Sequence, residues 1–134
     1  DTGNVIGLAD YAFSQLRELS KIIIPDGVLT IGKEAFSECA NLAEVDLPSS
    51  LRYIGMDAFS GCEKLKHITL PECLEVISQG AFSCSGLTNI RIPPNVKWIG
   101  PGAFDSCEQL KEIIILNPTI KIDEDAFCGC SGYP

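Results

Sequence analysis

The chain has 134 residues, of which 46% are hydrophobic and 21% are charged, and these proportions are typical of a folded domain rather than a disordered segment. Its eighteen acidic and ten basic residues give a net charge of −8, which disfavours binding to nucleic acid or to an anionic membrane. The longest apolar runs, such as residues 113–116, are far shorter than the roughly 20 residues that cross a bilayer.

An Ala-Phe pair recurs along the chain at a nearly fixed interval. Its phenylalanines lie 23, 23, 23, 22 and 23 residues apart, at Phe13, Phe36, Phe59, Phe82, Phe104 and Phe127. Such a period indicates a solenoid of stacked, equivalent units. The unit reads L-x-x-I-x-I-P-x-x-V-x-x-I-G-x-x-A-F-x-x-C-x-x and is clearest over residues 42–64.

The period divides this single repeat domain into six parts. We expect a partial unit at residues 1–18, full units at 19–41, 42–64, 65–86 and 87–109, and an incomplete last unit at 110–134. One unit is a residue short between Phe82 and Leu87, and we expect this change at a coil corner. Neither end resembles a polar cap, so we expect a segment of a longer protein.

Each unit begins with alternating apolar and polar residues, which is typical of a short, half-buried strand. Proline then starts a turn in four units, at Pro25, Pro48, Pro71 and Pro93. A second extended segment ends at a corner where positive φ is expected of Gly32, Gly55 and Gly100, and where Ser78 and Asp123 stand in other units. We expect the A-F-x-x-C stretch to form one helical or 3₁₀ turn around a buried phenylalanine. Because one coil buries too little apolar surface to be stable alone, neighbouring coils must pair their strands into parallel sheets.

These residues resemble the BspA-like leucine-rich repeats, whose unit carries the same I-P, I-G, A-F and C pattern. The resemblance runs from about Leu8 to Cys130. It implies a slightly curved, right-handed solenoid with the main parallel sheet on the concave side and a narrower ladder opposite. It also implies a bacterial or protozoan protein at the cell surface or secreted, with adhesion to host matrix proteins such as fibronectin and fibrinogen. Because the first residues do not form a signal peptide, this location rests on the resemblance.

Most cysteines occupy one place in the unit and are expected to form a buried column: Cys39, Cys62, Cys107 and Cys130, with Cys84 shifted by one residue. A strand spacing of about 4.8 Å would allow a disulfide. Because equivalent side chains point the same way, we expect reduced thiols that act as small apolar groups. Cys73 lies in a turn, where an exposed thiol is expected to cross-link during handling. The sequence Cys128-Gly129-Cys130 lacks a second ligand pair, and no metal site is predicted.

His67 is the only histidine, so any Ser-His or Cys-His dyad must include it. It precedes Ile68 on a predicted strand and is expected to face solvent. Aligned carboxylates such as Glu44 and Glu112 lack the enclosed cleft that a glycoside hydrolase needs. The sequence contains no P-loop, dinucleotide-binding or nucleophile-elbow motif. We therefore predict neither enzymatic activity nor a cofactor.

Outward-facing residues of the first strand are expected to form two rows along the main sheet. The first row is Lys21, Glu44, His67, Asn89 and Glu112, and the second row is Ile23, Asp46, Thr69, Arg91 and Ile114. Repeat proteins commonly bind partners through such side chains, which the sheet holds in register. A merely solvated face is the alternative.

The narrower ladder is expected to expose a third row, the ladder stripe, at Thr30, Tyr53, Val76, Trp98 and Lys121. Its members Tyr53, Val76 and Trp98 would form a contiguous apolar surface, and aromatic residues anchor many interfaces. Cross-strand packing that only stabilises the ladder is the alternative.

The sequence thus favours a binding module of a bacterial surface or secreted protein, with candidate contacts in the two rows and the stripe. Its expected partner is a protein or a glycan, and we expect neither nucleic-acid binding nor membrane insertion. The alternative is a structural spacer that holds other domains away from the cell. In a spacer, only core substitutions such as Phe59→Ala would matter, through stability.

Overall fold

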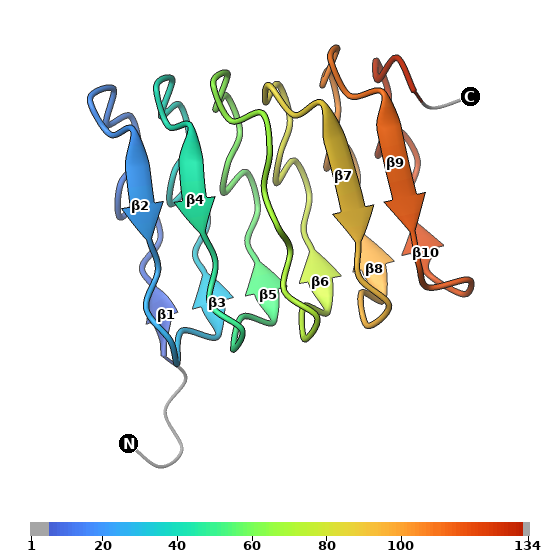
Figure 1. The fold of residues 1–134 in the computed structure, drawn as a ribbon, viewed down its shortest axis with the longest axis horizontal. Coiled ribbons are helices and arrows are strands. Elements are labelled where there is room, and N and C mark those ends of the chain that lie inside the picture. Colours follow the sequence, from blue (N-terminus) through green and yellow to red (C-terminus); the bar gives the residue numbers. More distant parts are fainter. Residues whose placement is uncertain (1–5, 133–134) are drawn as a thin grey trace.

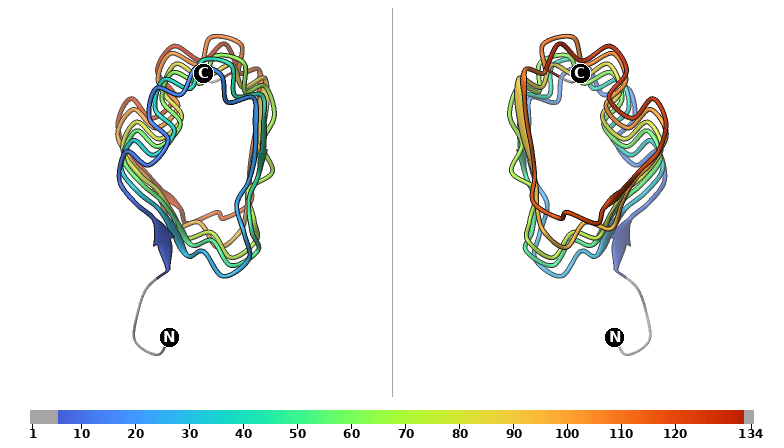
Figure 2. Two further views of the ribbon diagram at one scale, coloured as in Figure 1. Left: turned by 90° about the vertical axis from the view of Figure 1, so that its left-hand side faces the viewer. Right: turned by 90° about the vertical axis from the view of Figure 1, so that its right-hand side faces the viewer.

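The computed structural model describes residues 6–132 as a solenoid of successive, similar coils (Figure 1). Viewed along the long axis, the coils lie behind one another with nearly the same oval outline (Figure 2). The first and last coils therefore lie at opposite ends of the molecule (Figure 1). The predicted fold class, a solenoid of 23-residue repeats with parallel sheets, is confirmed.

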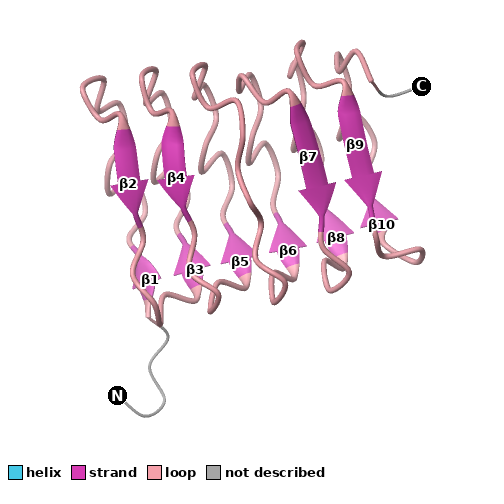
Figure 3. Ribbon diagram, in the orientation of Figure 1, coloured by secondary structure: helices cyan, strands magenta, loops and turns pink. Residues whose placement is uncertain are grey.

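Two sets of short strands run along the solenoid, and every pairing is parallel (Figure 3). The first set begins the predicted units: β2 (Lys21–Ile23), β4 (Glu44–Asp46), β7 (Asn89–Ile92) and β9 (Glu112–Ile115). The second set contains two-residue strands: β1 (Gly7–Leu8), β3 (Thr30–Ile31), β5 (Tyr53–Ile54), β6 (Val76–Ile77), β8 (Trp98–Ile99) and β10 (Lys121–Ile122).

The narrower ladder is the continuous sheet of this solenoid. Its six strands pair in the order β1-β3-β5-β6-β8-β10. The first set forms the main sheet only as two separate pairs, β2 with β4 and β7 with β9. Between these pairs, residues 66–70 run as an extended loop, so the strand predicted for this coil is not formed.

The proline turns form as the sequence predicts. The carbonyls of Pro25, Pro48, Pro71 and Pro93 each accept a hydrogen bond from the amide three residues later, at 3.1 to 3.4 Å. These turns redirect the chain from the main sheet toward the narrower ladder in four successive coils.

The predicted helical turn is not formed, because residues 6–132 contain no helix. Hydrogen bonds in the Ala-Phe segment instead alternate in direction. The amides of Ala35 and Ser37 donate to the carbonyl three residues earlier, whereas those of Phe36 and Glu38 donate to the next coil. Positive φ values at Glu34 (53°) and Glu38 (60°) accompany this alternation. Every second amide thus joins neighbouring coils, which a helix would prevent.

A column of phenylalanine rings fills the core. The six rings stack with centroids 5.0 to 5.3 Å apart and planes within 10° of parallel. The four inner rings, those of Phe36, Phe59, Phe82 and Phe104, are fully buried. Because equivalent rings are related by the coil repeat, this spacing is also the translation from one coil to the next.

The prediction of positive φ at Gly32, Gly55 and Gly100 is wrong. Positive φ occurs instead immediately before each Ala-Phe pair and two residues after it: Tyr11, Glu34, Asp57, Gly80, Gly102, Asp125, and Gln15, Glu38, Gly61, Cys84, Ser106, Gly129. The corner glycines serve close packing. A Cβ atom on Gly55 would lie 2.6 Å from the carbonyl oxygen of Ile31 in the preceding coil, which is a steric clash.

The predicted buried column contains four cysteines: Cys39, Cys62, Cys107 and Cys130. All seven cysteines of the chain are free thiols. Each thiol of the column donates to a phenylalanine carbonyl of the preceding coil at 3.0 to 3.3 Å. The placement of Cys84 in this column is wrong, because Cys84 is exposed. Ser85 takes its place, with its Oγ atom 3.3 Å from Sγ of Cys107. The residue missing from this unit is therefore lost after Ser85.

Candidate binding surface

The main sheet places the two predicted rows side by side on one face, which we call the main face. Strand pairing sets Lys21 beside Glu44 and Ile23 beside Asp46, and β7 and β9 continue both rows in the same register. All ten side chains of the two rows are exposed, as predicted. Apolar residues end the second row on both sides, with Ile23 63% exposed and Ile114 45% exposed.

The extended loop at residues 66–70 interrupts the main face in its middle. His67 and Thr69 still face solvent there. No backbone hydrogen bond joins residues 67–69 to a neighbouring coil in the described part of the chain. The loop adjoins the shortened corner, where the Gly86 amide donates to the Cys62 carbonyl at 3.1 Å. The backbone groups of residues 67–69 are therefore available to bond to water or to a ligand, whereas the carbonyl of Lys66 accepts a hydrogen bond from the amide of Thr88 at 3.0 Å.

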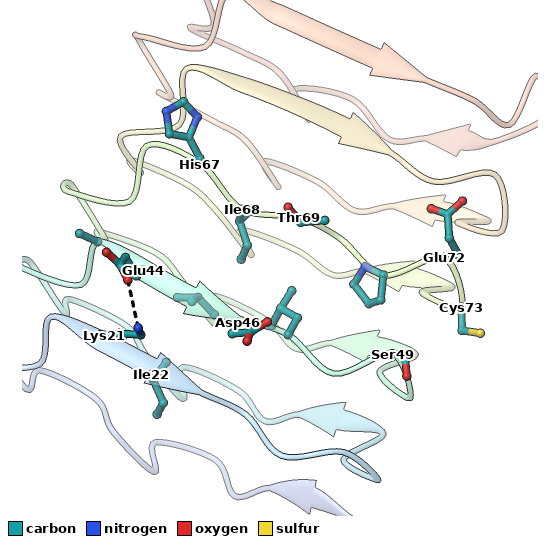
Figure 4. A pocket seen from close by; sticks show the side chains of 14 residues that line it. Lys21, Ile22, Glu44, Asp46, Ser49, His67, Ile68, Thr69, Glu72 and Cys73 are labelled. Atoms are coloured by element: carbon teal, nitrogen blue, oxygen red, sulfur yellow. Dashed lines mark ion pairs between the residues drawn. The ribbon is translucent and has the colours of Figure 1, made fainter.

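A depression with a volume of about 670 Å³ lies at this break in the main sheet (Figure 4). Its half-buried apolar lining includes Ile22, Val45, Leu47 and Ile68. Its exposed polar lining includes Lys21, Glu44, Asp46, His67, Thr69 and Glu72. Figure 4 shows Glu72 and Cys73 at the opposite end of the depression from Lys21 and His67. Five of the predicted binding residues thus meet at one site.

Ion pairs neutralise most of the charge around the depression. Lys21 lies 3.5 Å from Glu44, and Arg91 contacts both carboxylate oxygens of Glu72, at 2.6 and 3.3 Å. The hydrogen bonds from Arg91 hold the pKa of Glu72 below its ordinary value. Asp46 forms no ion pair with any described residue. The main face therefore presents two carboxylates without an ion pair among the described residues, Asp46 and Glu112, and Asp46 lies directly beside the exposed Ile23.

The sole histidine bonds to an amide rather than to a nucleophile. Nδ1 of His67 lies 3.3 Å from Nδ2 of Asn89. Neither a serine nor a cysteine side chain forms a hydrogen bond to His67 within residues 6–132. The arrangement supplies a polar contact between coils and no Ser-His or Cys-His pair.

The ladder stripe forms in register along the continuous sheet, although only part of it is exposed. Strand pairing aligns Thr30, Tyr53, Val76, Trp98 and Lys121. Tyr53 is 40% exposed, whereas Val76 and Trp98 are half-buried. The indole Nε1 of Trp98 donates to Asp123 at 3.0 Å. These contacts agree with the alternative prediction, in which the stripe stabilises the ladder.

Two features of the surface were missed in the sequence. One is the break in the main sheet, together with the depression that lies there. The 22-residue interval indicates that one coil is irregular, but it does not indicate that the irregularity interrupts the main sheet. The other is a charged row beside the ladder stripe, in which Glu75 contacts Arg52 at 3.1 Å and Lys97 at 3.6 Å. The sequence could have predicted this row, because Arg52, Glu75 and Lys97 occupy the same place in three successive units and alternate in charge.

The exposed thiols do not belong to a cluster of metal ligands among the described residues. Cys73, Cys84 and Cys128 are the exposed thiols of the chain. Over residues 6–132, no three histidine, cysteine or acidic side chains are grouped as ligands for a metal ion. The same residues include no helix that could cross a lipid bilayer.

Stacked coils, parallel sheets and an internal phenylalanine column define a leucine-rich-repeat domain, a scaffold for protein interaction. The chain belongs to the family of BspA type leucine rich repeat regions, whose model matches residues 7–133 in six copies. No curated protein matches the chain in sequence.

Several solved bacterial structures are similar to this chain. A leucine-rich repeat protein from Bacteroides ovatus ATCC 8483 is 38% identical over 83% of the chain, with a TM-score of 0.79. The T. pallidum leucine rich repeat protein TpLRR is 30% identical over the whole chain, with a TM-score of 0.73. The pneumococcal vaccine antigen PcpA is 26% identical over 79% of the chain, with a TM-score of 0.72. The chain spans 29%, 74% and 26% of these three proteins, respectively.

Proposed function

We propose that this chain is a protein-binding module that acts at the bacterial cell surface or after secretion, and that its main face contacts the partner. The observation that carries the proposal is the depression of about 670 Å³ at the break in the main sheet, flanked by two exposed rows. Side chains on paired strands lose little freedom on binding, so such a face can recognise a partner selectively. Similarity to a pneumococcal vaccine antigen supports the proposed location.

Adhesion to a host matrix protein is the specific form of this function that we propose. The net charge of −8 suits a partner with a basic surface, because complementary charge speeds encounter and suppresses wrong partners. The unpaired carboxylate of Asp46 lies where such a surface would meet the main face.

A binding assay on immobilised fibronectin, fibrinogen and a glycan array tests the proposal. The main-face variant Asp46→Lys/Glu112→Lys is compared with Tyr53→Ala on the narrower ladder, and thermal unfolding verifies that both are folded. We expect saturable binding to a matrix protein that only the main-face variant loses. Loss confined to Tyr53→Ala would move the site to the ladder stripe. Binding to none of the probes would contradict the proposal and favour the structural spacer.

A further inference from the structure

The second row carries more information about a partner than its exposure alone. Along the solenoid it reads isoleucine, aspartate, threonine, arginine and isoleucine, one residue from each of five successive coils: Ile23, Asp46, Thr69, Arg91 and Ile114. Ile23 and Ile114 belong to the few large apolar side chains that are exposed on the described chain. The row thus has two apolar ends separated by a polar middle.

The distance between these apolar ends follows from the coil repeat. Four coil translations separate Ile23 from Ile114, and each is 5.0 to 5.3 Å at the phenylalanine column, or about 21 Å in all. An α-helix rises about 5.4 Å per turn, so four turns, or about 14 residues, also span roughly 21 Å. Same-side residues of an extended strand lie about 6.7 Å apart, and four such steps reach roughly 27 Å.

This comparison selects one kind of partner segment. A helix lying along the row would stay in step with the coils to within about 1 Å over five contacts, whereas a strand would drift by about 6 Å. Its contacting residues would be i, i+4, i+7, i+11 and i+14, which lie on one face of a helix. The row therefore matches an amphipathic helix of at least four turns.

Charge decides which helix fits. Arg91 is already bound to Glu72 by two hydrogen bonds, whereas Asp46 has no ion-pair partner among the described residues. The position opposite Asp46, i+4, therefore favours lysine or arginine. The depression of about 670 Å³ beside Thr69 leaves room for a bulky apolar side chain at i+7.

We propose that the main face binds a basic amphipathic α-helix of a partner protein, which lies along the second row with apolar residues at i, i+7 and i+14 and a cation at i+4. This inference rests on the proposed function and names the partner segment. Anchors at Ile23 and Ile114 set the length of the helix, and Asp46 sets its direction. The net charge of −8 attracts such a helix from solution.

The probe is an alanine- and glutamine-based peptide, held helical by a side-chain lactam, with leucine at i, i+7 and i+14 and lysine at i+4. A scrambled peptide of the same composition and an extended peptide with the same four side chains at alternate positions serve as controls. Methyl NMR signals of Ile23 and Ile114 report contact, and fluorescence anisotropy reports affinity. We expect the helical probe alone to shift both isoleucine signals.

A charge exchange tests the register. Asp46→Lys should weaken binding of the lysine probe by about tenfold, and a probe with glutamate at i+4 should restore it. Equal binding of the scrambled or extended peptide, a shift at only one isoleucine, or no effect of Asp46→Lys would overturn the inference. If matrix proteins bind the main face while the helical probe does not, the proposed function stands and this inference fails.

Discussion

Left-handed backbone at two places in every Ala-Phe segment is the residue-level feature that makes the coils stack. In the first five Ala-Phe segments, this backbone turns alternate amides toward the next coil. A residue with a side chain in this conformation costs roughly 1 kcal/mol relative to glycine. Cys84 has a φ of 56° at the place where Gly61 and Gly129 stand in other coils.

The variant Cys84→Gly should therefore stabilise the domain by about 0.5 to 1 kcal/mol, since it relieves the unfavourable φ at an exposed position. Urea unfolding gives the change. The control Ser83→Gly replaces the preceding residue, which has no positive φ, and should destabilise the domain. An equal effect of the two substitutions would show that Cys84 is not strained.

The buried thiols should make the domain less stable at alkaline pH. Burial raises the pKa of Cys62 and of Cys130 to about 12, from an ordinary value of 9.0. The folded state holds these protons more tightly than the unfolded state, so their stabilisation is complete below pH 9 and is lost as the pH rises toward 12. Above pH 9, the Cys62 thiol should lower the free energy of unfolding by about 1.4 kcal/mol per pH unit, and the less enclosed Cys130 thiol should lower it by less.

Denaturant unfolding between pH 8 and about 11 measures this dependence. The variant Cys62→Ala should show a shallower fall in stability than the wild type, because one shifted thiol is removed. Cys73→Ala, which removes an exposed thiol instead of a buried one, serves as the control. Identical slopes for all three proteins would exclude a contribution from the buried thiol.

At the level of the element, the phenylalanine column carries the core. Phe59 is fully buried between the rings of Phe36 and Phe82, at 5.1 and 5.3 Å. Replacing it with alanine leaves a cavity, because the narrower ladder and the Ala-Phe hydrogen bonds hold the coils at a fixed spacing. We expect Phe59→Ala to destabilise the domain by about 3 to 5 kcal/mol.

Thermal or urea unfolding gives this loss, and Phe13→Ala is the matched control. Phe13 has a stacked ring on one side among the described residues and is only half-buried, so its replacement should cost less. Equal losses at the two positions would contradict the role assigned to stacking on both sides.

The strands, turns and core were predictable because they repeat. Apolar alternation located the first strands, proline located the turns and Phe59 with its equivalents located the core. The residues with positive φ could not be predicted from the positions of glycine alone. Glu38 and Asp57 also adopt positive φ, because their amides gain hydrogen bonds to the next coil that offset the cost of this conformation. The break at residues 66–70 was also not predictable, because residues 65–70 follow the repeat pattern and the loop differs only in its pairing.

At the level of the whole molecule, the two sheets are held together unequally. The narrower ladder is continuous through all six coils, whereas the main sheet is interrupted. The coil that contains residues 67–69 is therefore anchored by β6 and by its phenylalanine, and not by its main strand. Local opening of this coil should begin on the main face.

Hydrogen exchange followed by NMR checks this expectation. The amides of His67, Ile68 and Thr69 should exchange at least about 100-fold faster than those of Val76 and Ile77 in the same coil, which is equivalent to ~2.7 kcal/mol of protection. The amides of Ile90 and Arg91, in a paired main strand, serve as the control. Comparable protection in residues 67–69 would mean that the main sheet is continuous in solution.

The near-constant spacing of the phenylalanine rings has an evolutionary consequence. Because each coil presents to its successor nearly the same surface that it receives from its predecessor, a stretch of gene that encodes one coil can be duplicated or deleted in frame, and the remaining coils still fit. Each such event would move Ile23 and Ile114 apart or together by one coil. Recombination can therefore change the length of the recognition surface while the packing of the core stays the same.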